Sequence, residues 1–258
     1  MGEFSGKSVL ITGGTSGIGF AVAKAFLREG ASVLICGRSE ERGRVALAQL
    51  NDFGDEIKFL EADVRDESKV KRLLQYSLDC FDNLDFAFNN AGVFLREPPF
   101  HEHNSDFWEE VISANLTGVY YCMKHEIIAM GRARPESHRA IVNNASIVAH
   151  RGSQSSGLAY TAAKHGVLGL TKQAAINHVI DNIRVNAVSP GPTLTEATKA
   201  GLEGVPEEVQ EKIKALNPAG TLVEEDEIAA TVLFLCSGRA TMINGHDIPL
   251  DGGQLAKL

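Results

Sequence analysis

The chain has 258 residues, of which 44% are hydrophobic, and 25 Lys and Arg stand against 33 Asp and Glu, for a net charge of −8. This length and hydrophobic content are typical of one α/β domain, here over residues 1–258. The excess of acidic over basic residues argues against nucleic acid as a partner. No apolar run approaches the ~20 residues that span a membrane, and residues 1–5 lack a secretory pattern, so we expect a cytoplasmic protein without a membrane partner. The scattered cysteines suggest reduced thiols and no metal site: Cys36, Cys80, Cys122 and Cys236.

Predicted strands and helices alternate along the chain. The apolar run that begins at Ser8 predicts a first strand, and the amphipathic stretch 20–28, closed by Gly30, predicts a first helix. Further strands are predicted at 32–36, 57–61, 84–89, 140–145, 183–188 and 246–248. Further helices are predicted at 40–50, 67–80, 105–130, 158–179 and 224–236, with Ser39 and Asp66 as N-caps. This order predicts a doubly wound parallel sheet of Rossmann type with three layers.

A glycine-rich turn joins the first strand to the first helix. Gly13, Gly17 and Gly19 follow the spacing Gly-x-x-x-Gly-x-Gly, which differs from the usual Gly-x-Gly-x-x-Gly. Glycines let the backbone approach a phosphate, and a helix N-terminus offers free N–H groups. A purely structural turn is the alternative, but the strand before it and the helix after it favour a dinucleotide site.

Tyr160 and Lys164 lie four residues apart, which places both side chains on one face of a helix. A tyrosine hydroxyl ordinarily has a pKa of about 10, and a neighbouring ammonium lowers it, so this pair could pass protons to or from a substrate. Taken alone, the spacing describes an ordinary exposed helix pair. Ser146 lies fourteen residues before the tyrosine and follows an apolar strand.

Together these features resemble the short-chain dehydrogenase/reductase family, in its single-domain, NADP-preferring branch. The resemblance covers nearly the whole chain, and its motifs occur in the family's order. They are the glycine turn of residues 12–19, Asp63-Val64, Asn89-Asn90-Ala91-Gly92, Asn115, Ser146, Tyr160, Lys164 and Pro190-Gly191-Pro192-Thr193. The interval from Ser146 to Tyr160 is one residue longer than in many relatives, so the loop between them is expected to differ.

The resemblance implies hydride transfer between a nicotinamide and a carbonyl carbon, catalysed by Asn115, Ser146, Tyr160 and Lys164. Tyr160 then exchanges the proton, Lys164 lowers its pKa and bonds the nicotinamide ribose, Ser146 holds the substrate oxygen, and Asn115 anchors a water. Asp63 is expected to accept from the adenine amino group, Ile18 to touch the nicotinamide and Thr193 to bond the carboxamide. The remaining expected cofactor residues are Gly13, Thr15, Ser16, Gly17, Gly19, Arg38, Val64, Asn90, Ala91, Gly92, Pro190 and Gly191.

The cofactor is expected to be NADP rather than NAD. Gly37 stands where NAD-binding sheets carry an acidic residue for the ribose, and Arg38 follows it. A guanidinium can hold a 2′-phosphate through two charge-assisted hydrogen bonds. The alternative is a solvated Arg38 with Glu40 or Glu41 on the ribose, and the glycine turn itself carries no second basic residue.

The substrate is expected to be a medium-sized, neutral or mildly polar ketone or secondary alcohol. We expect a lid at residues 190–222 to hold it in part, with Phe94, Leu95, His150 and Leu158 as further walls. Reduction of a 3-oxoacyl chain on a carrier protein is one alternative, for which Lys124, Arg132, Arg134 and Arg139 form the only basic cluster. A cofactor-binding regulator without turnover is the other. A homo-oligomer is expected, with a tetramer favoured over a dimer and with Val119, Cys122 and Leu168 facing outward.

Overall fold

Seven parallel strands form one sheet in the computed structural model, which describes residues 2–54, 56–95, 97–131, 138–153 and 156–257. Their order across the sheet is β3-β2-β1-β4-β5-β6-β7. The strands are β1 Ser8–Thr12, β2 Ser32–Gly37, β3 Ile57–Glu61, β4 Phe86–Asn89, β5 Arg139–Asn144, β6 Ile183–Pro190 and β7 Asp247–Leu250. The chain order reverses between β1 and β4, and in open α/β sheets this is where ligands bind. The predicted doubly wound parallel sheet is therefore confirmed.

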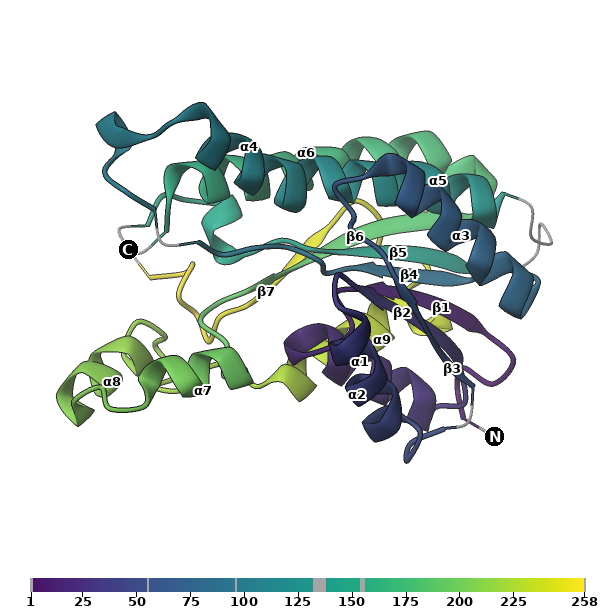
Figure 1. Cartoon of the computed structure of the whole chain (residues 1–258), viewed down its shortest axis with the longest axis horizontal. Coiled ribbons are helices and arrows are strands. Elements are labelled where there is room, and N and C mark those ends of the chain that lie inside the picture. The colour runs from purple at the N-terminus through teal and green to yellow at the C-terminus, as the bar shows by residue number, and fades with distance from the viewer. Residues whose placement is uncertain (1, 55, 96, 132–137, 154–155, 258) are drawn as a thin grey trace.

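Helices cover both faces of the sheet and make three layers (Figure 1). The helices on one face are α1 Gly17–Arg28, α2 Glu40–Leu50 and α9 Glu225–Cys236; those on the other are α3 Glu67–Phe81, α4 Ser105–Ile112, α5 Gly118–Met130 and α6 Leu158–His178. Because side chains alternate along a strand, Val9 and Ile11 of β1 enter the core under α1 and α9 while Leu10 enters the core under α3 and α5. The hydrophobic β-strands are thus buried on both sides.

The predicted helix ends agree closely with the structure. The Ser39 side chain accepts from the Arg42 N–H, and the Asp66 side chain accepts from the N–H groups of Ser68 and Lys69, so both predicted N-caps are confirmed. Gly30 follows the end of α1 with a positive φ of 82°, as its predicted role requires. Two short helices that were not predicted, α7 Glu196–Leu202 and α8 Glu207–Lys214, lie in the segment expected to form a lid.

The predicted helical stretch over residues 105–130 is confirmed, but it is not α-helical throughout. A π-helical turn, Ser113–Thr117, separates α4 from α5. It contains Asn115, whose side-chain amide donates to the carbonyls of Val93 and Val111, at 2.9 Å each, and accepts from the Val93 N–H at 3.2 Å. Such turns often occur at functional sites, and this one attaches the helix to the loop that follows β4.

A buried carboxyl group lies in the core between α5 and the sheet. The Asn89 amide donates to Glu126 Oε2 and to Asn143 Oδ1, at 3.0 Å each, and thereby joins β4 to α5 and β5. Glu126 Oε1 has no hydrogen-bond partner among the described residues, and burial raises the pKa of Glu126 to about 8 against the weaker opposing effect of Asn89. Glu126 is therefore largely protonated in the folded protein at neutral pH.

This arrangement predicts that stability falls as pH rises. The pKa of Glu126 in the folded protein lies above its unfolded value of 4.5. The contribution of protonated Glu126 to stability is therefore complete below pH 4.5 and is lost as pH rises through about 8. In this window the free energy of unfolding should fall by up to about 1.4 kcal/mol per pH unit from this group. Glu126→Gln keeps an acceptor for Asn89, and urea unfolding at several pH values should show that the fall disappears. An equally steep fall in the variant would contradict the assignment.

Candidate active site

The glycine turn between β1 and α1 approaches the loop after β4 closely. Gly13 and Gly17 have φ values of 64° and 60°, in the left-handed region that favours glycine. A Cβ atom on Gly13 would lie 2.9 Å from the Ala91 Cα, and one on Gly19 would lie 2.3 Å from the Gly13 carbonyl oxygen. These positions must be glycine because larger side chains would separate the two loops. The turn thus opens a narrow crevice at the β1–β4 switch point.

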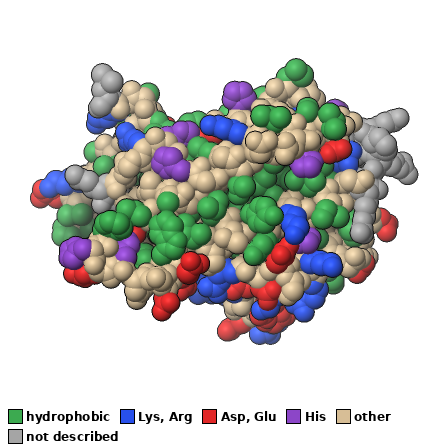
Figure 2. Space-filling model, turned by 90° about the horizontal axis from the view of Figure 1, so that it is seen from above, with side chains coloured by type: hydrophobic (Ala, Val, Ile, Leu, Met, Phe, Trp, Pro, Cys, Tyr) green, Lys and Arg blue, Asp and Glu red, His purple; other side chains and the backbone are tan. Residues whose placement is uncertain are grey.

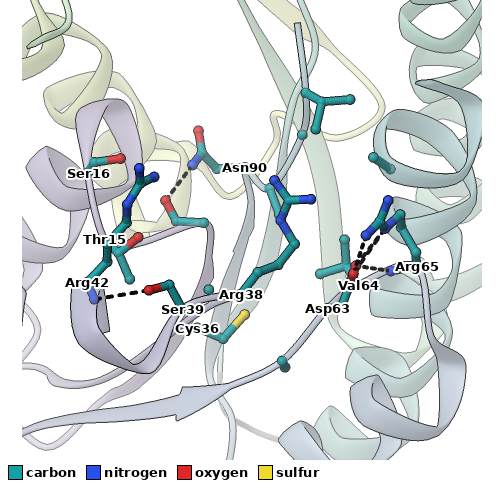
Figure 3. Close-up of a pocket in the computed structure, with 17 residues that line it drawn as sticks. Thr15, Ser16, Cys36, Arg38, Ser39, Arg42, Asp63, Val64, Arg65 and Asn90 are labelled. Carbon is teal, nitrogen blue, oxygen red and sulfur yellow. Dashed lines mark hydrogen bonds and ion pairs between the residues drawn. The ribbon is translucent and has the colours of Figure 1, made fainter. Parts of the chain in front are cut away.

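A cavity of about 470 Å³ occupies this crevice (Figure 3). Nine of the expected cofactor residues line it: Gly13, Thr15, Ser16, Arg38, Asp63, Val64, Asn90, Ala91 and Gly92. Gly17 lines a neighbouring cavity, and Gly19 and the partly buried Ile18 lie in α1. The remaining expected residues lie at the end of β6, which is Pro190, and just after it. There the Thr193 hydroxyl donates to the Gly191 carbonyl at 2.9 Å. The structure therefore brings nine of the expected cofactor residues together around one cavity.

Two guanidinium groups line one side of the cavity. Arg38 follows β2, and Arg42 lies in the first turn of α2 with its side chain beside Thr15 and Ser16 (Figure 3). Sequence reasoning missed Arg42, although its place three residues after the N-cap Ser39 was a usable signal. A Cβ on Gly37 would lie 3.0 Å from the Thr15 side chain, so an acidic residue has little room there.

The expected alternative ribose ligands do not lie in this cavity. Among the described residues that line it, neither Glu40 nor Glu41 is present, and Glu41 lines the neighbouring cavity instead. Asp63 is the only carboxylate among the described residues of the lining, and it lies at the far side from Arg42 (Figure 3). The end of the cavity near α2 is therefore positively charged.

Asp63 has a partner that the sequence did not reveal. The Arg65 side chain donates to the Asp63 carboxylate from Nε, at 3.0 Å to each oxygen, and from Nη2 at 2.6 Å. This hydrogen bonding holds the pKa of Asp63 below its usual value, so the carboxylate stays charged. Arg65 also lies 3.5 Å from Glu110 of α4. Any adenine amino group at Asp63 must share this carboxylate with Arg65.

A chain of hydrogen bonds links Lys164 to the glycine turn. Lys164 Nζ donates to the Asn144 carbonyl at 2.7 Å, and the Asn144 amide donates to Asn90 Oδ1 at 2.8 Å. The Asn90 amide donates in turn to the carbonyls of Thr12 and Gly13, at 3.2 and 3.1 Å. Sequence reasoning assigned no role to Asn144, yet it is the connection between the two halves of the site.

Ser146, Tyr160 and Lys164 lie together at the end of β5 and the start of α6. Burial raises the pKa of Tyr160 to about 12, and a hydrogen bond with Ser146 lowers it by a smaller amount. Burial also lowers the pKa of Lys164 to about 8, and its Nζ lies 5.5 Å from the Tyr160 ring centre. The expected lowering of the phenol pKa by Lys164 is therefore not found, because desolvation of the phenol is the larger effect.

Asn115 lies in the π-helical turn before α5, and its side chain bonds to the backbone. Both amide hydrogens donate to the backbone, to Val93 and Val111, and the oxygen accepts from Val93. A Cβ on Gly92 would lie 2.5 Å from Asn115 Oδ1, which shows how tightly the loop packs on this side chain. The side chain of Asn115 positions the loop after β4.

A doubly wound sheet with a polar cavity at its switch point is typical of oxidoreductases that bind a nicotinamide dinucleotide. A family model described as enoyl-(acyl carrier protein) reductase matches residues 13–254. The chain belongs to the short-chain dehydrogenase/reductase family. Among its relatives, a cis-4-hydroxycyclohexanecarboxylate dehydrogenase of Sinomonas cyclohexanicum is 37% identical and covers 99% of this chain and 100% of its own.

Two further comparisons bear on the cofactor and on the substrate. A 3-oxoacyl-[acyl-carrier-protein] reductase of Chlamydia pneumoniae is 37% identical and covers 96% of both chains. The crystal structure of an actinorhodin polyketide ketoreductase with NADPH has a TM-score of 0.89 and 30% identity, and covers 98% of this chain and 99% of that one. The family resemblance that the sequence motifs indicated is thus confirmed.

Proposed function

We propose that the protein reduces a ketone to a secondary alcohol with NADPH. The observation that carries this proposal is the partly buried, hydrogen-bonded pair of Ser146 and Tyr160, whose phenol pKa of about 12 keeps it protonated at neutral pH. A protonated phenol suits a proton donor, which is the role that carbonyl reduction requires. The hydrogen-bonded chain from Lys164 to Gly13 supports the proposal, because it connects the helix that carries Tyr160 to the glycine turn beside the cavity.

The chain's own residues have distinct tasks in this proposal. Tyr160 donates its proton to the carbonyl oxygen, and the Ser146 hydroxyl donates a hydrogen bond to the same oxygen as negative charge develops there. Lys164, charged below about pH 8, stabilises the phenolate that remains. When bound, NADPH supplies the hydride for the carbonyl carbon.

The cavity fits NADPH by the chemistry of its lining. The glycine turn at Gly13 gives backbone N–H groups for a pyrophosphate, and Arg38 and Arg42 can hold a 2′-phosphate with paired charge-assisted hydrogen bonds. NAD lacks that phosphate, and the α2 end of the cavity offers no carboxylate for its free ribose hydroxyl among the described lining residues. We therefore assign NADP as the cofactor, with Asp63, Val64, Ala91 and Gly92 toward the adenosine.

Reduction of a carrier-bound 3-oxoacyl chain is the second candidate, because one relative is named for that activity. The basic cluster expected to dock the carrier gives it little support. Lys124 is paired with Glu67 at 2.7 Å, and Arg139 is buried and donates to the Met130 carbonyl. Arg132 and Arg134 lie outside the described residues.

An assay of NADPH oxidation with simple ketones and with acyl thioesters separates these functions. We expect turnover with ketones and a kcat/KM for acyl thioesters at least about tenfold lower. Faster reduction of the thioesters would favour the carrier-bound substrate. The absence of turnover with every carbonyl compound, despite tight NADPH binding, would favour a cofactor-binding regulator.

The segment 190–222 is proposed as the substrate lid. Neither α7 nor α8, both of which the structure describes completely, has a buried side chain. An open cavity of about 660 Å³ lies between them, lined in part by Leu194, Leu202 and Leu222. Elements with so little buried surface open at low free-energy cost, as a lid requires.

A homotetramer also remains a proposal, but its expected contacts need correction. Val119, Cys122 and Leu168 are buried in the core under α5 and α6 and cannot face a partner. Figure 2 looks onto the side where α4, α5 and α6 lie uppermost in Figure 1, and hydrophobic side chains form patches there. The exposed apolar residues of these helices include Trp108, Tyr120, Ile128 and Ile176.

None of the described helices is both long enough and apolar enough to cross a membrane. The cytoplasmic location stays a prediction.

A further inference from the structure

The segment between β4 and α4 is attached to the helix that carries Tyr160. At its start, Val93 is held by the Asn115 side chain. Four residues later, Glu97 Oε1 accepts from the backbone N–H of Ala159 at 3.1 Å, across 62 positions of sequence. The Glu97 side chain is only 12% exposed, although it lies in a connecting segment. These two attachments fix the segment beside the candidate proton donor.

Glu97 supplies a cap that α6 does not provide for itself. The N-cap residue Gly157 has no side chain, and the first turn of α6 contains no acidic residue. A Cβ on Gly157 would lie 1.5 Å from Glu97 Oε2, so glycine leaves the room that the carboxylate occupies. A carboxylate at a helix N-terminus accepts a hydrogen bond from a backbone N–H group that has no partner within the helix. Its negative charge also interacts favourably with the positive end of the helix dipole, so both effects stabilise the helix.

His103 makes a further contact with Glu97 from within the same segment. Its Nε2 donates to the Pro98 carbonyl at 2.9 Å and lies 3.5 Å from Glu97 Oε1. The imidazole itself packs between the rings of Phe100 and Phe107, with centroids 5.5 and 5.3 Å away. Glu97 is therefore held in place by its own segment as well as by α6.

Phe94 lies between the two attachments and touches Tyr160. The ring centroids are 5.1 Å apart and the rings meet edge to face at 86°. Despite this contact, Phe94 is 65% exposed, and Leu95 and Leu158 beside it are also exposed. A large exposed aromatic residue next to a reactive phenol is typical of a surface that binds a ligand.

We propose that Glu97 is a positioning residue that sets Phe94 as the aromatic wall of the substrate site, and that the preferred substrate is a ketone with an apolar ring next to its carbonyl group. This inference rests on the proposed role of Tyr160. The ring of the substrate stacks on Phe94 while its carbonyl oxygen meets Tyr160 and Ser146. Glu97 contributes through α6 and through the segment, without touching the substrate.

The positioning role is tested with Glu97→Ala, Glu97→Gln and Glu102→Ala. Glu102 is the matched control, because it lies in the same segment and its side chain is 59% exposed beside His101. With acetophenone we expect Glu97→Ala to raise KM and to lower kcat by about tenfold each, and to leave the Kd for NADPH unchanged. Glu97→Gln keeps an acceptor for the Ala159 N–H and should recover most of the loss. Hydrogen exchange of residues 158–161 should accelerate in Glu97→Ala alone.

The aromatic wall is tested with Phe94→Ala and two ketones, acetophenone and butanone. We expect the kcat/KM for acetophenone to fall by about three- to tenfold, as the loss of one aromatic contact implies, and that for butanone to change less than about twofold. Equal losses for both ketones would overturn the proposed wall. Wild-type kinetics in Glu97→Ala would overturn the positioning role.

Failure of this inference can be told apart from failure of the proposed function. If Tyr160→Phe abolishes turnover while the Glu97 and Phe94 variants behave as wild type, the reaction stands and the inference falls. If Tyr160→Phe retains turnover, the proposed mechanism falls first, and the hydrogen-exchange result still reports whether Glu97 holds α6.

Discussion

Tyr160→Phe is expected to lower kcat for ketone reduction by about a thousandfold, because phenylalanine has no proton to give to the carbonyl oxygen. The phenol is partly buried and its pKa is raised to about 12, so it carries its proton throughout the neutral range. The ring stays in place in the variant, including the edge-to-face contact with Phe94. The Kd for NADPH, measured by fluorescence, should therefore change little.

The matched control is Tyr120→Phe, which removes the same hydroxyl from an exposed position on α5. This variant should keep wild-type kcat and KM. Near-normal turnover in Tyr160→Phe, or an equal loss in the control, would remove Tyr160 from the mechanism. A crystal structure of the inactive variant would show whether Ser146 and Lys164 keep their places.

Arg38→Asp should raise the KM for NADPH by about a hundredfold and change that for NADH by less than about threefold. The guanidinium lines the α2 end of the cavity, where a 2′-phosphate would be its partner. The substitution removes two charge-assisted hydrogen bonds and adds a repelling carboxylate. Steady-state kinetics with both cofactors at saturating ketone give the comparison.

Arg42 should contribute to the same preference, so Arg42→Gln is expected to raise the KM for NADPH by about tenfold. Arg44 provides the control, because it is exposed on the same helix and does not line the cavity. Arg44→Asp changes the net charge as Arg38→Asp does and should leave both cofactors unaffected. Equal effects of Arg38→Asp on NADPH and NADH would contradict a phosphate role.

Local patterns explain what the sequence could predict. The strands follow from hydrophobic runs in the sequence. The N-caps Ser39 and Asp66 depend on single side chains that accept hydrogen bonds from the backbone two or three residues further on. The glycine turn was recognisable because positive φ values favour glycine at Gly13 and Gly17, and because the close approach of Ala91 requires it at Gly13. These features need no knowledge of distant parts of the chain.

Tertiary contacts explain what the sequence could not predict. Asn144 connects Lys164 to Asn90 only because β5 lies beside β4. The outward face of α5 was predicted wrongly because apolar residues occur all around that helix, so periodicity does not identify the buried side. Burial depth was equally invisible, and it decides the pKa values of Tyr160 and Lys164.

The asparagine pair Asn90 and Asn144 has a consequence for how the two reactants bind. Because one continuous set of hydrogen bonds runs from the Gly13 carbonyl to the Lys164 ammonium, ordering either end restrains the other. Coenzyme bound at the glycine turn should therefore raise the affinity for the alcohol or ketone. The alcohol or ketone must then raise the affinity for the coenzyme by the same factor. Breaking the chain at Asn144 should make the two affinities independent, a loss of synergy that calorimetric titration of each reactant with and without the other would measure.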